Sequence, residues 1–147
     1  MKTILDTGHS WLLESMLYHD SLEILLIEGI KCAEPEKLKI ANVELGEGYS
    51  IEVTDQSRRF AIVFQDVLTY QVTNESYTSG DEYEIRTPGV LCKYERSRYL
   101  DFVRSSTLIE SFSTGNYFHF GLLLEDDIVD VVTQSEPKIV PLPLGNS

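Results

Sequence analysis

The sequence predicts a mostly β domain: an antiparallel sheet folded as a sandwich or a partly open barrel, with one or two short helices. Apolar runs of strand length recur between short polar turns, and aromatic and β-branched residues dominate these runs. Turn signals come too often for parallel strands linked by helices. An α+β arrangement stays open. The 147 residues suffice for one core, and no shift in composition divides them, so we expect a single domain over residues 1–147.

The first predicted element is a hairpin. Residues 11–18 and 22–30 are apolar runs, separated by His19, Asp20 and Ser21, which tolerate a tight turn. In the second run apolar residues alternate with Glu23 and Glu28, as in a half-buried strand. A helix is the competing interpretation of this run, because Leu and Glu favour helices.

The middle of the chain predicts short strands and loops. Residues 34–39 hold Pro35 and mixed charges and indicate a connection, and Gly46 and Gly48 indicate a turn before a strand over 49–54. Residues 59–72 give the clearest strand pattern, with β-branched and aromatic residues at period two. The polar residues 74–84 predict a loop.

The C-terminal part predicts a strand over 90–94 and then a helix over 97–105, with Ser97 as its N-cap. Residues 117–124 and 128–132 predict a hairpin that turns at 125–127. Three prolines make residues 136–147 a poor candidate for regular structure, so we expect an irregular tail.

Charge limits the partners. The formal net charge is -12, with an isoelectric point near 4.5, and such a field repels nucleic acids and anionic membranes. An acidic chain suits a basic protein partner. Nothing in the sequence resembles a signal peptide or a membrane span, so we expect a cytoplasmic protein. Cys32 and Cys92 are then expected to be free thiols, although spacing does not exclude a bridge between them.

Motifs for catalysis are missing from the sequence. The three histidines show no metal-ligand spacing, and no nucleophile elbow or phosphate-binding loop is present. We therefore expect no catalytic residues, no cofactor and no metal. His119 lies between Phe118 and Phe120 in a strand, so it should point away from both and form structural hydrogen bonds.

Two groups of charged residues remain as candidates. Residues 86–104 hold five basic residues against two acidic ones, which we expect to pair with neighbouring carboxylates. The densest acidic cluster lies at the predicted hairpin turn, where Asp is common in any case. We take this cluster as the candidate partner-binding site: Glu125, Asp126, Asp127 and Asp130.

The C-terminal third has a recognisable order of segments. The helix 97–103 is followed by Tyr117-Phe118-His119-Phe120, then by Ile128-Val129-Asp130-Val131-Val132, then by Glu136-Pro137-Lys138-Ile139. This order resembles small, largely uncharacterised bacterial proteins, some of which look like immunity proteins that neutralise a toxin. The resemblance implies a non-catalytic acidic protein that blocks a basic partner such as a toxin domain. The alternatives are an oligomerising scaffold module and a small-ligand-binding domain.

Overall fold

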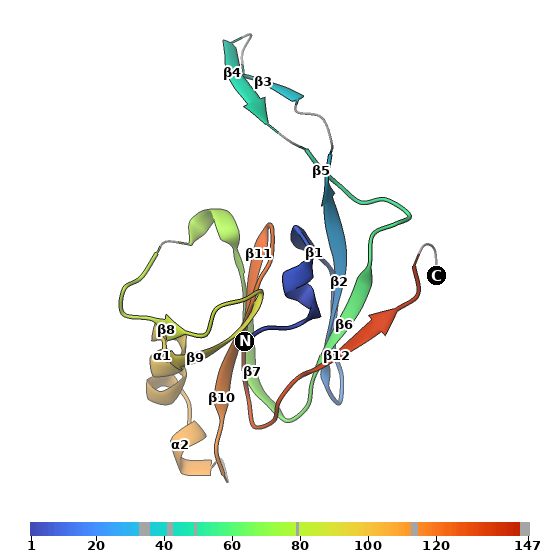
Figure 1. Cartoon of the computed structure of the whole chain (residues 1–147). Helices are drawn as coiled ribbons and strands as arrows, with labels where there is room; N and C mark the ends of the chain where they lie inside the picture. Colours follow the sequence, from blue (N-terminus) through green and yellow to red (C-terminus); the bar gives the residue numbers. More distant parts are fainter. Residues whose placement is uncertain (33–35, 41–42, 49, 79, 113–114, 145–147) are drawn as a thin grey trace.

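Two antiparallel sheets pack against each other around an apolar core (Figure 1). The structure is a computed structural model that describes residues 1–32, 36–40, 43–48, 50–78, 80–112 and 115–144. The first sheet has the order β1-β2-β6-β12, with β5 pairing to the end of β2. Its strands are β1 (Ser10–Tyr18), β2 (Leu22–Lys31), β5 (Ile51–Glu52), β6 (Arg59–Phe64) and β12 (Lys138–Leu142).

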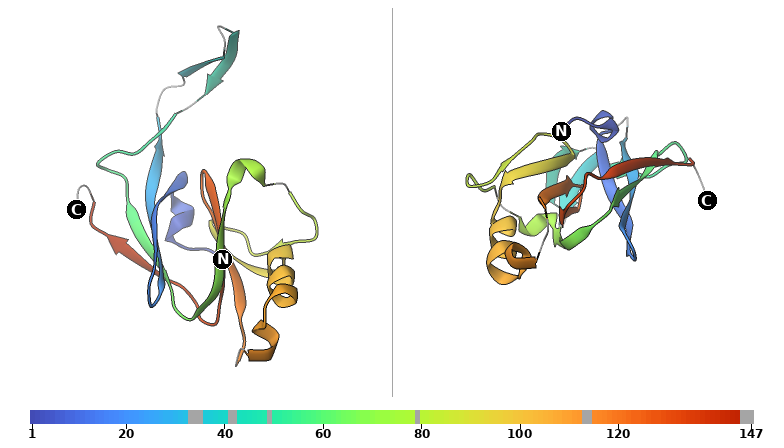
Figure 2. Two further views of the ribbon diagram at one scale, coloured as in Figure 1. Left: turned by 180° about the vertical axis from the view of Figure 1, so that it is seen from behind. Right: turned by 90° about the horizontal axis from the view of Figure 1, so that it is seen from below.

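The second sheet has the order β7-β11-β10-β9-β8. Its strands are β7 (Val67–Asn74), β8 (Ile85–Arg86), β9 (Leu91–Arg96), β10 (Phe118–Leu123) and β11 (Asp127–Thr133). Two helices, α1 (Arg98–Ser106) and α2 (Ile109–Phe112), lie on the side of this sheet that faces away from the first sheet (Figure 2). Short 3-10 turns, η1 (Ile4–Thr7) and η2 (Glu75–Tyr77), lie before β1 and after β7.

The core forms where the alternating side chains of the two sheets meet. In β6 every second residue is buried, with Ile62 and Phe64 fully so, and in β10 Phe120 and Leu122 point to the same core. The rings of Phe64 and Phe120 join the sheets with centroids 6.0 Å apart. Burial of these apolar surfaces is the main source of stability for such a sandwich.

The predicted mostly β class with antiparallel sheets is confirmed, in the form of an open sandwich. The N-terminal hairpin is confirmed as β1 and β2, and the strand interpretation of the second run holds because its buried residues alternate. The C-terminal hairpin is confirmed as β10 and β11. Helix α1 begins after Ser97, whose hydroxyl accepts a hydrogen bond from the Leu100 N–H, as expected for an N-cap.

Two predictions for the middle of the chain are wrong. The segment expected to be a connection contains β3 (Glu36–Ile40), which pairs with β4 (Val43–Gly48) in a hairpin that projects from the sheets (Figure 1). Gly46 and Gly48 belong to β4 and mark no turn; Tyr49 lies outside the described residues. Polar and apolar residues alternate over Lys37–Ile40, a pattern that is typical of a strand. The nearby Pro35 favoured the interpretation as a connection instead.

The long strand predicted over residues 59–72 is two strands that belong to different sheets. The chain leaves β6 at Gln65 and turns at Asp66, whose φ of 51° lies in the left-handed region. Thr133 fixes the turn, because its hydroxyl donates to the Gln65 carbonyl. The alternation is interrupted at Gln65 and Asp66 and resumes in the same phase at Leu68 and Tyr70, so the predicted strand ran through the break.

The predicted irregular tail is also wrong in part. Residues Lys138–Leu142 form β12, which pairs with β6 at the edge of the first sheet. Pro141 fits there because an edge strand has N–H groups that no neighbouring strand needs. Cys32 and Cys92 are free, and Cys92 is buried. None of the helices in the described part of the chain is long and apolar enough to cross a lipid bilayer.

Candidate functional site

A groove of about 1050 Å³ opens on the outer face of the second sheet. Its floor is the sheet, one wall is helix α1, and the other wall is formed by residues 75–78 and 80–86, which lie between β7 and β9 in the chain (Figure 1). The sheet contributes Gln71, Thr73, Tyr94, Leu123, Ile128 and Asp130. The walls contribute Glu75, Thr78, Gly80, Asp81, Glu84, Arg86, Arg98, Tyr99 and Phe102.

The outer wall is held to helix α1 by Tyr83. Its hydroxyl donates to the Asp101 carboxylate, and the guanidinium groups of Arg96 and Arg98 lie 4.6 Å and 4.8 Å from its ring centroid. The Arg96 side chain also donates to the Tyr83 carbonyl at 2.6 Å, and Arg98 forms an ion pair with Asp81. These contacts fix the width of the groove, because they join its two walls.

The floor of the groove contains an aromatic stack. The Tyr94 ring lies parallel to the His119 ring, with centroids 4.0 Å apart and an interplanar angle of 8°. Tyr94 and His119 are cross-strand partners in β9 and β10. Residue 121 is glycine where the Tyr94 ring crosses β10: a Cβ there would lie 2.9 Å from Tyr94 Cε2. A side chain at this position would displace the ring.

A buried chain of hydrogen bonds runs beneath this stack. Ser97 Oγ lies 2.7 Å from His119 Nδ1, and His119 Nε2 lies 2.7 Å from Asp130 Oδ1. Gln71 Nε2 donates to the other Asp130 oxygen at 3.2 Å. The carboxylate is an acceptor, so Nε2 carries a proton and donates it to Asp130. Each of these polar groups therefore has a partner, which offsets the cost of burying it.

This chain has the composition of a hydrolase triad, but its geometry is structural. Ser97 is 0% exposed and His119 is 1% exposed, so a substrate does not reach the hydroxyl. The same hydroxyl also caps helix α1. The three residues thus join the start of α1 to β10 and β11, and the hydrogen bonds expected of His119 are present.

Neither the buried Cys92 thiol nor the Tyr94 phenol of the floor is activated. Burial raises the pKa of the Cys92 thiol above its ordinary value, although Arg86 acts in the opposite direction. Burial also raises the pKa of Tyr94, with a further contribution from nearby acidic groups. Both groups are therefore neutral near pH 7, and the Tyr94 ring gives the floor an uncharged aromatic surface beside Asp130.

The walls give the groove its acidic character. Four carboxylates line it against two guanidinium groups, and the ion pair between Asp81 and Arg98 neutralises one of each. Asp130 is held by His119 and Gln71. Within the described ranges, Glu75, Glu84 and Arg86 have no oppositely charged group within 4 Å. Two carboxylates of this groove are therefore available to a ligand.

The structure does not bring the four predicted partner-binding residues together. Glu125 and Asp126 are exposed at the turn between β10 and β11, and Asp127 is half-buried at the start of β11. Asp130 is 8% exposed and lies against His119 on the floor of the groove. Asp130 therefore lies apart from the other three, because it points to the opposite side of the strand from Val129 and Val131 in the core. Partner binding by these four residues stays a prediction.

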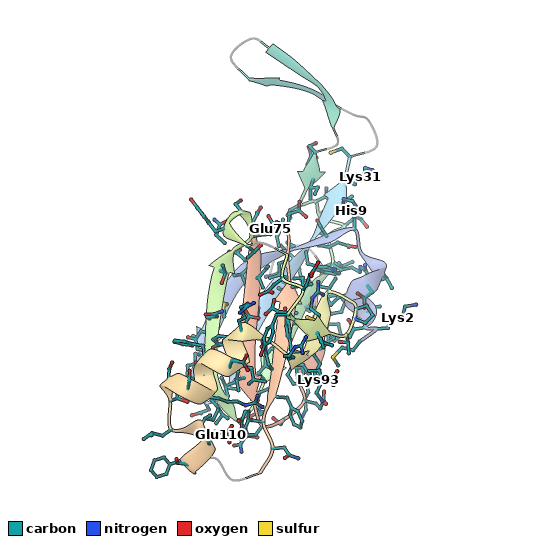
Figure 3. The ribbon with its side chains drawn as sticks, turned by 90° about the vertical axis from the view of Figure 1, so that its left-hand side faces the viewer. Lys2, His9, Lys31, Glu75, Lys93 and Glu110 are labelled. Carbon is teal, nitrogen blue, oxygen red and sulfur yellow. The ribbon has the colours of Figure 1, made fainter. Side chains whose placement is uncertain are left out.

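Three of the five basic residues in the segment 86–104 form the expected ion pairs with carboxylates of the same chain. Lys93 pairs with Glu136, Arg98 with Asp81 and Arg104 with Glu110. Figure 3 shows Glu75 and Glu110 toward opposite ends of the side that carries α1. Sequence reasoning missed Glu75 and Glu84, because they lie in a loop without a motif.

Comparison of the chain with protein-family models, curated proteins and solved structures gave no match.

Proposed function

We propose that this chain is a non-catalytic binding protein of the bacterial immunity type, which takes a basic segment of a partner such as a toxin domain into the groove. The observation that carries the proposal is the pair of carboxylates, Glu75 and Glu84, that line the groove without an ion pair in the described part of the chain. A Lys or Arg side chain entering between the walls would meet both charges and the aromatic floor.

The rest of the molecule supports a binding role. The net charge of -12 steers a basic partner toward the protein and repels acidic competitors. The walls are already joined by Tyr83 and Arg98, so little ordering is needed when a ligand enters. The resemblance of the C-terminal segments to immunity-type proteins agrees with this function.

The test is a calorimetric titration with a tetra-arginine peptide. We expect the double variant Glu75→Gln/Glu84→Gln to weaken binding about tenfold, since each exposed ion pair contributes up to about 1 kcal/mol. The control is Glu23→Gln/Glu52→Gln, which removes the same charge from exposed positions in the first sheet. Equal weakening in both double variants would contradict the proposal, because the net charge alone would then explain binding.

A pull-down from a lysate of the source cell extends the test to a natural partner. The wild type and the two double variants serve as bait, and the bound protein is eluted with salt. We expect a basic protein that is lost from the groove variant and kept by the control. A partner that both variants retain would bind outside the groove.

A second candidate, a site for a small anionic ligand, is favoured by Arg86. This guanidinium lines the groove beside Tyr94 and forms no ion pair within the described residues. The variant Arg86→Gln separates the two functions. Removing this positive charge should strengthen the binding of tetra-arginine under the main proposal, and should abolish the binding of a small anion under the second.

A further inference from the structure

The edges of the two sheets differ in how they are protected against pairing with another strand. In the first sheet, β12 carries Lys138 and Pro141, and β1 is interrupted by an irregularity at Glu14, which pairs with Arg59. In the second sheet, the edge strand β8 has only two residues. A charge, a proline, a bulge and a short length are the usual means by which an edge avoids association.

Strand β7 is the remaining edge, and it has little of this protection. Its eight residues include no charged residue and no proline. Its one irregularity lies between Val67 and Thr69, so Thr69–Asn74 pair with β11 in continuous register. Tyr70 is 38% exposed and Val72 is 44% exposed. Six regular, uncharged residues at an open edge are a template for another strand.

The sequence of β7 is complementary to itself. An antiparallel pair related by a two-fold axis through Gln71 places Tyr70 opposite Val72 of the second copy and Thr69 opposite Thr73. Aromatic residues opposite β-branched residues, and Thr opposite Thr, are favourable cross-strand pairs. In this register the flanking Asp66 meets Ser76, and Glu75 meets Val67. No carboxylate faces another one, which matters between two chains that each carry -12.

We propose that β7 is a homodimer interface, in which a second copy of this chain adds its own β7 in antiparallel register about Gln71. The second sheet of one copy then continues into the second sheet of the other copy, and the two copies are equivalent. The grooves lie side by side on the same face, because Gln71 lines the groove of each copy. This interface does not depend on the proposed function of the groove. Strand β7 is neutral, so it has no charge with which to select a basic partner. Its self-complementary sequence favours the β7 strand of a second copy of this chain.

Sedimentation equilibrium of the full chain at about 0.15 M and about 1 M salt tests the interface. We expect a dimer that strengthens with salt, because salt screens the repulsion between the acidic chains. Val72→Lys should make the protein monomeric. Val140→Lys on the protected edge β12, where the side chain is 42% exposed against 44% for Val72, should dimerise as the wild type does. A monomeric wild type at both salt concentrations would overturn the proposal, and so would equal dimerisation of the two variants.

Oxidative cross-linking tests the register. Gln71→Cys places two thiols opposite each other across the two-fold axis, so we expect a covalent dimer on oxidation, above the level given by the wild-type thiols. Thr73→Cys is the control, because its two thiols lie four residues out of register, roughly 13 Å apart along the strands. Circular dichroism verifies that both variants fold. Absence of the dimer from Gln71→Cys, or equal cross-linking from Thr73→Cys, would contradict this register.

Discussion

The two faces of the second sheet are built from the same strands but stabilised in different ways. The inner face is apolar, with Phe120 and Val131 packed against the first sheet. The outer face carries His119 and Asp130 in adjacent strands, half covered by α1 and half open as the groove. The inner face therefore gives the fold most of its stability, whereas hydrogen bonds on the outer face hold the floor of the groove in place.

The largest expected effect is on the inner face. Phe120→Ala removes a ring that is fully buried and contacts Phe64, and we expect a loss of about 3–5 kcal/mol in the free energy of unfolding, from lost burial and the resulting cavity. Urea denaturation followed by circular dichroism measures it. A loss below about 1 kcal/mol would mean that this face does not carry the core.

The outer face should respond less, and most strongly where its hydrogen bonds are broken. Asp130→Ala leaves the buried His119 without an acceptor, and we expect a loss of about 3 kcal/mol by the same denaturation experiment. Asp126→Ala, at the exposed turn that precedes the same strand, should change the stability by less than about 0.5 kcal/mol. Equal effects of the two substitutions would show that the buried chain of hydrogen bonds contributes nothing specific.

The aromatic floor offers a steric test. Gly121→Ala places a Cβ 2.9 Å from Tyr94 Cε2 and 3.1 Å from Cys92 Sγ, so the Tyr94 ring must leave its stack on His119. We expect a loss of about 2 kcal/mol. The double variant Gly121→Ala/Tyr94→Ala should lose less than the sum of the two single variants, because the clash with the Tyr94 ring is then absent. Additive losses would contradict the close approach.

The smallest effect concerns an ion pair of the first sheet. Arg58 lowers the pKa of Glu28 through a two-pronged contact, with Nη2–Oε2 at 2.7 Å and Nε–Oε1 at 3.1 Å. A lowered folded-state pKa stabilises the protein above the unfolded value near 4.3, and this stability is lost as the pH falls through the folded value. Glu28→Gln should therefore cost up to about 1 kcal/mol at pH 7 and nothing at the lowest pH. A constant difference across the pH range would contradict the linkage.

Hydrophobic alternation predicted most of the fold. It located β1, β2, β10 and β11, and the capping preference of serine located the N-cap at Ser97, because these features depend on local patterns. It did not reveal the turn at Asp66 or the pairing of β12 with β6, because both depend on contacts between residues far apart in the sequence. Pairing with distant strands overrides the local preference of a proline-containing tail.

The candidate site was predictable only in part. His119 could be assigned to the outer side of its strand from its aromatic neighbours. Its contact with Asp130 depends on the register of β10 and β11, and a shift of one residue would send Asp130 to the other face. Glu75 and Glu84 both line the groove, and the wall near Glu84 is held to α1 by Tyr83 and by the ion pair of Asp81 with Arg98. No pattern in the sequence encodes that contact.

A two-dimensional NMR titration of the ¹⁵N-labelled protein with tetra-arginine shows most directly whether a basic ligand binds in the groove. If the groove is the binding site, the largest shifts will come from backbone amides along it, at Gln71, Thr73, Gly80 and Phe102. The first sheet, at Glu23 for example, will be unaffected. Shifts that follow the acidic residues over the whole surface, or that centre on Glu125 and Asp126 at the hairpin turn, would contradict the assignment of the groove.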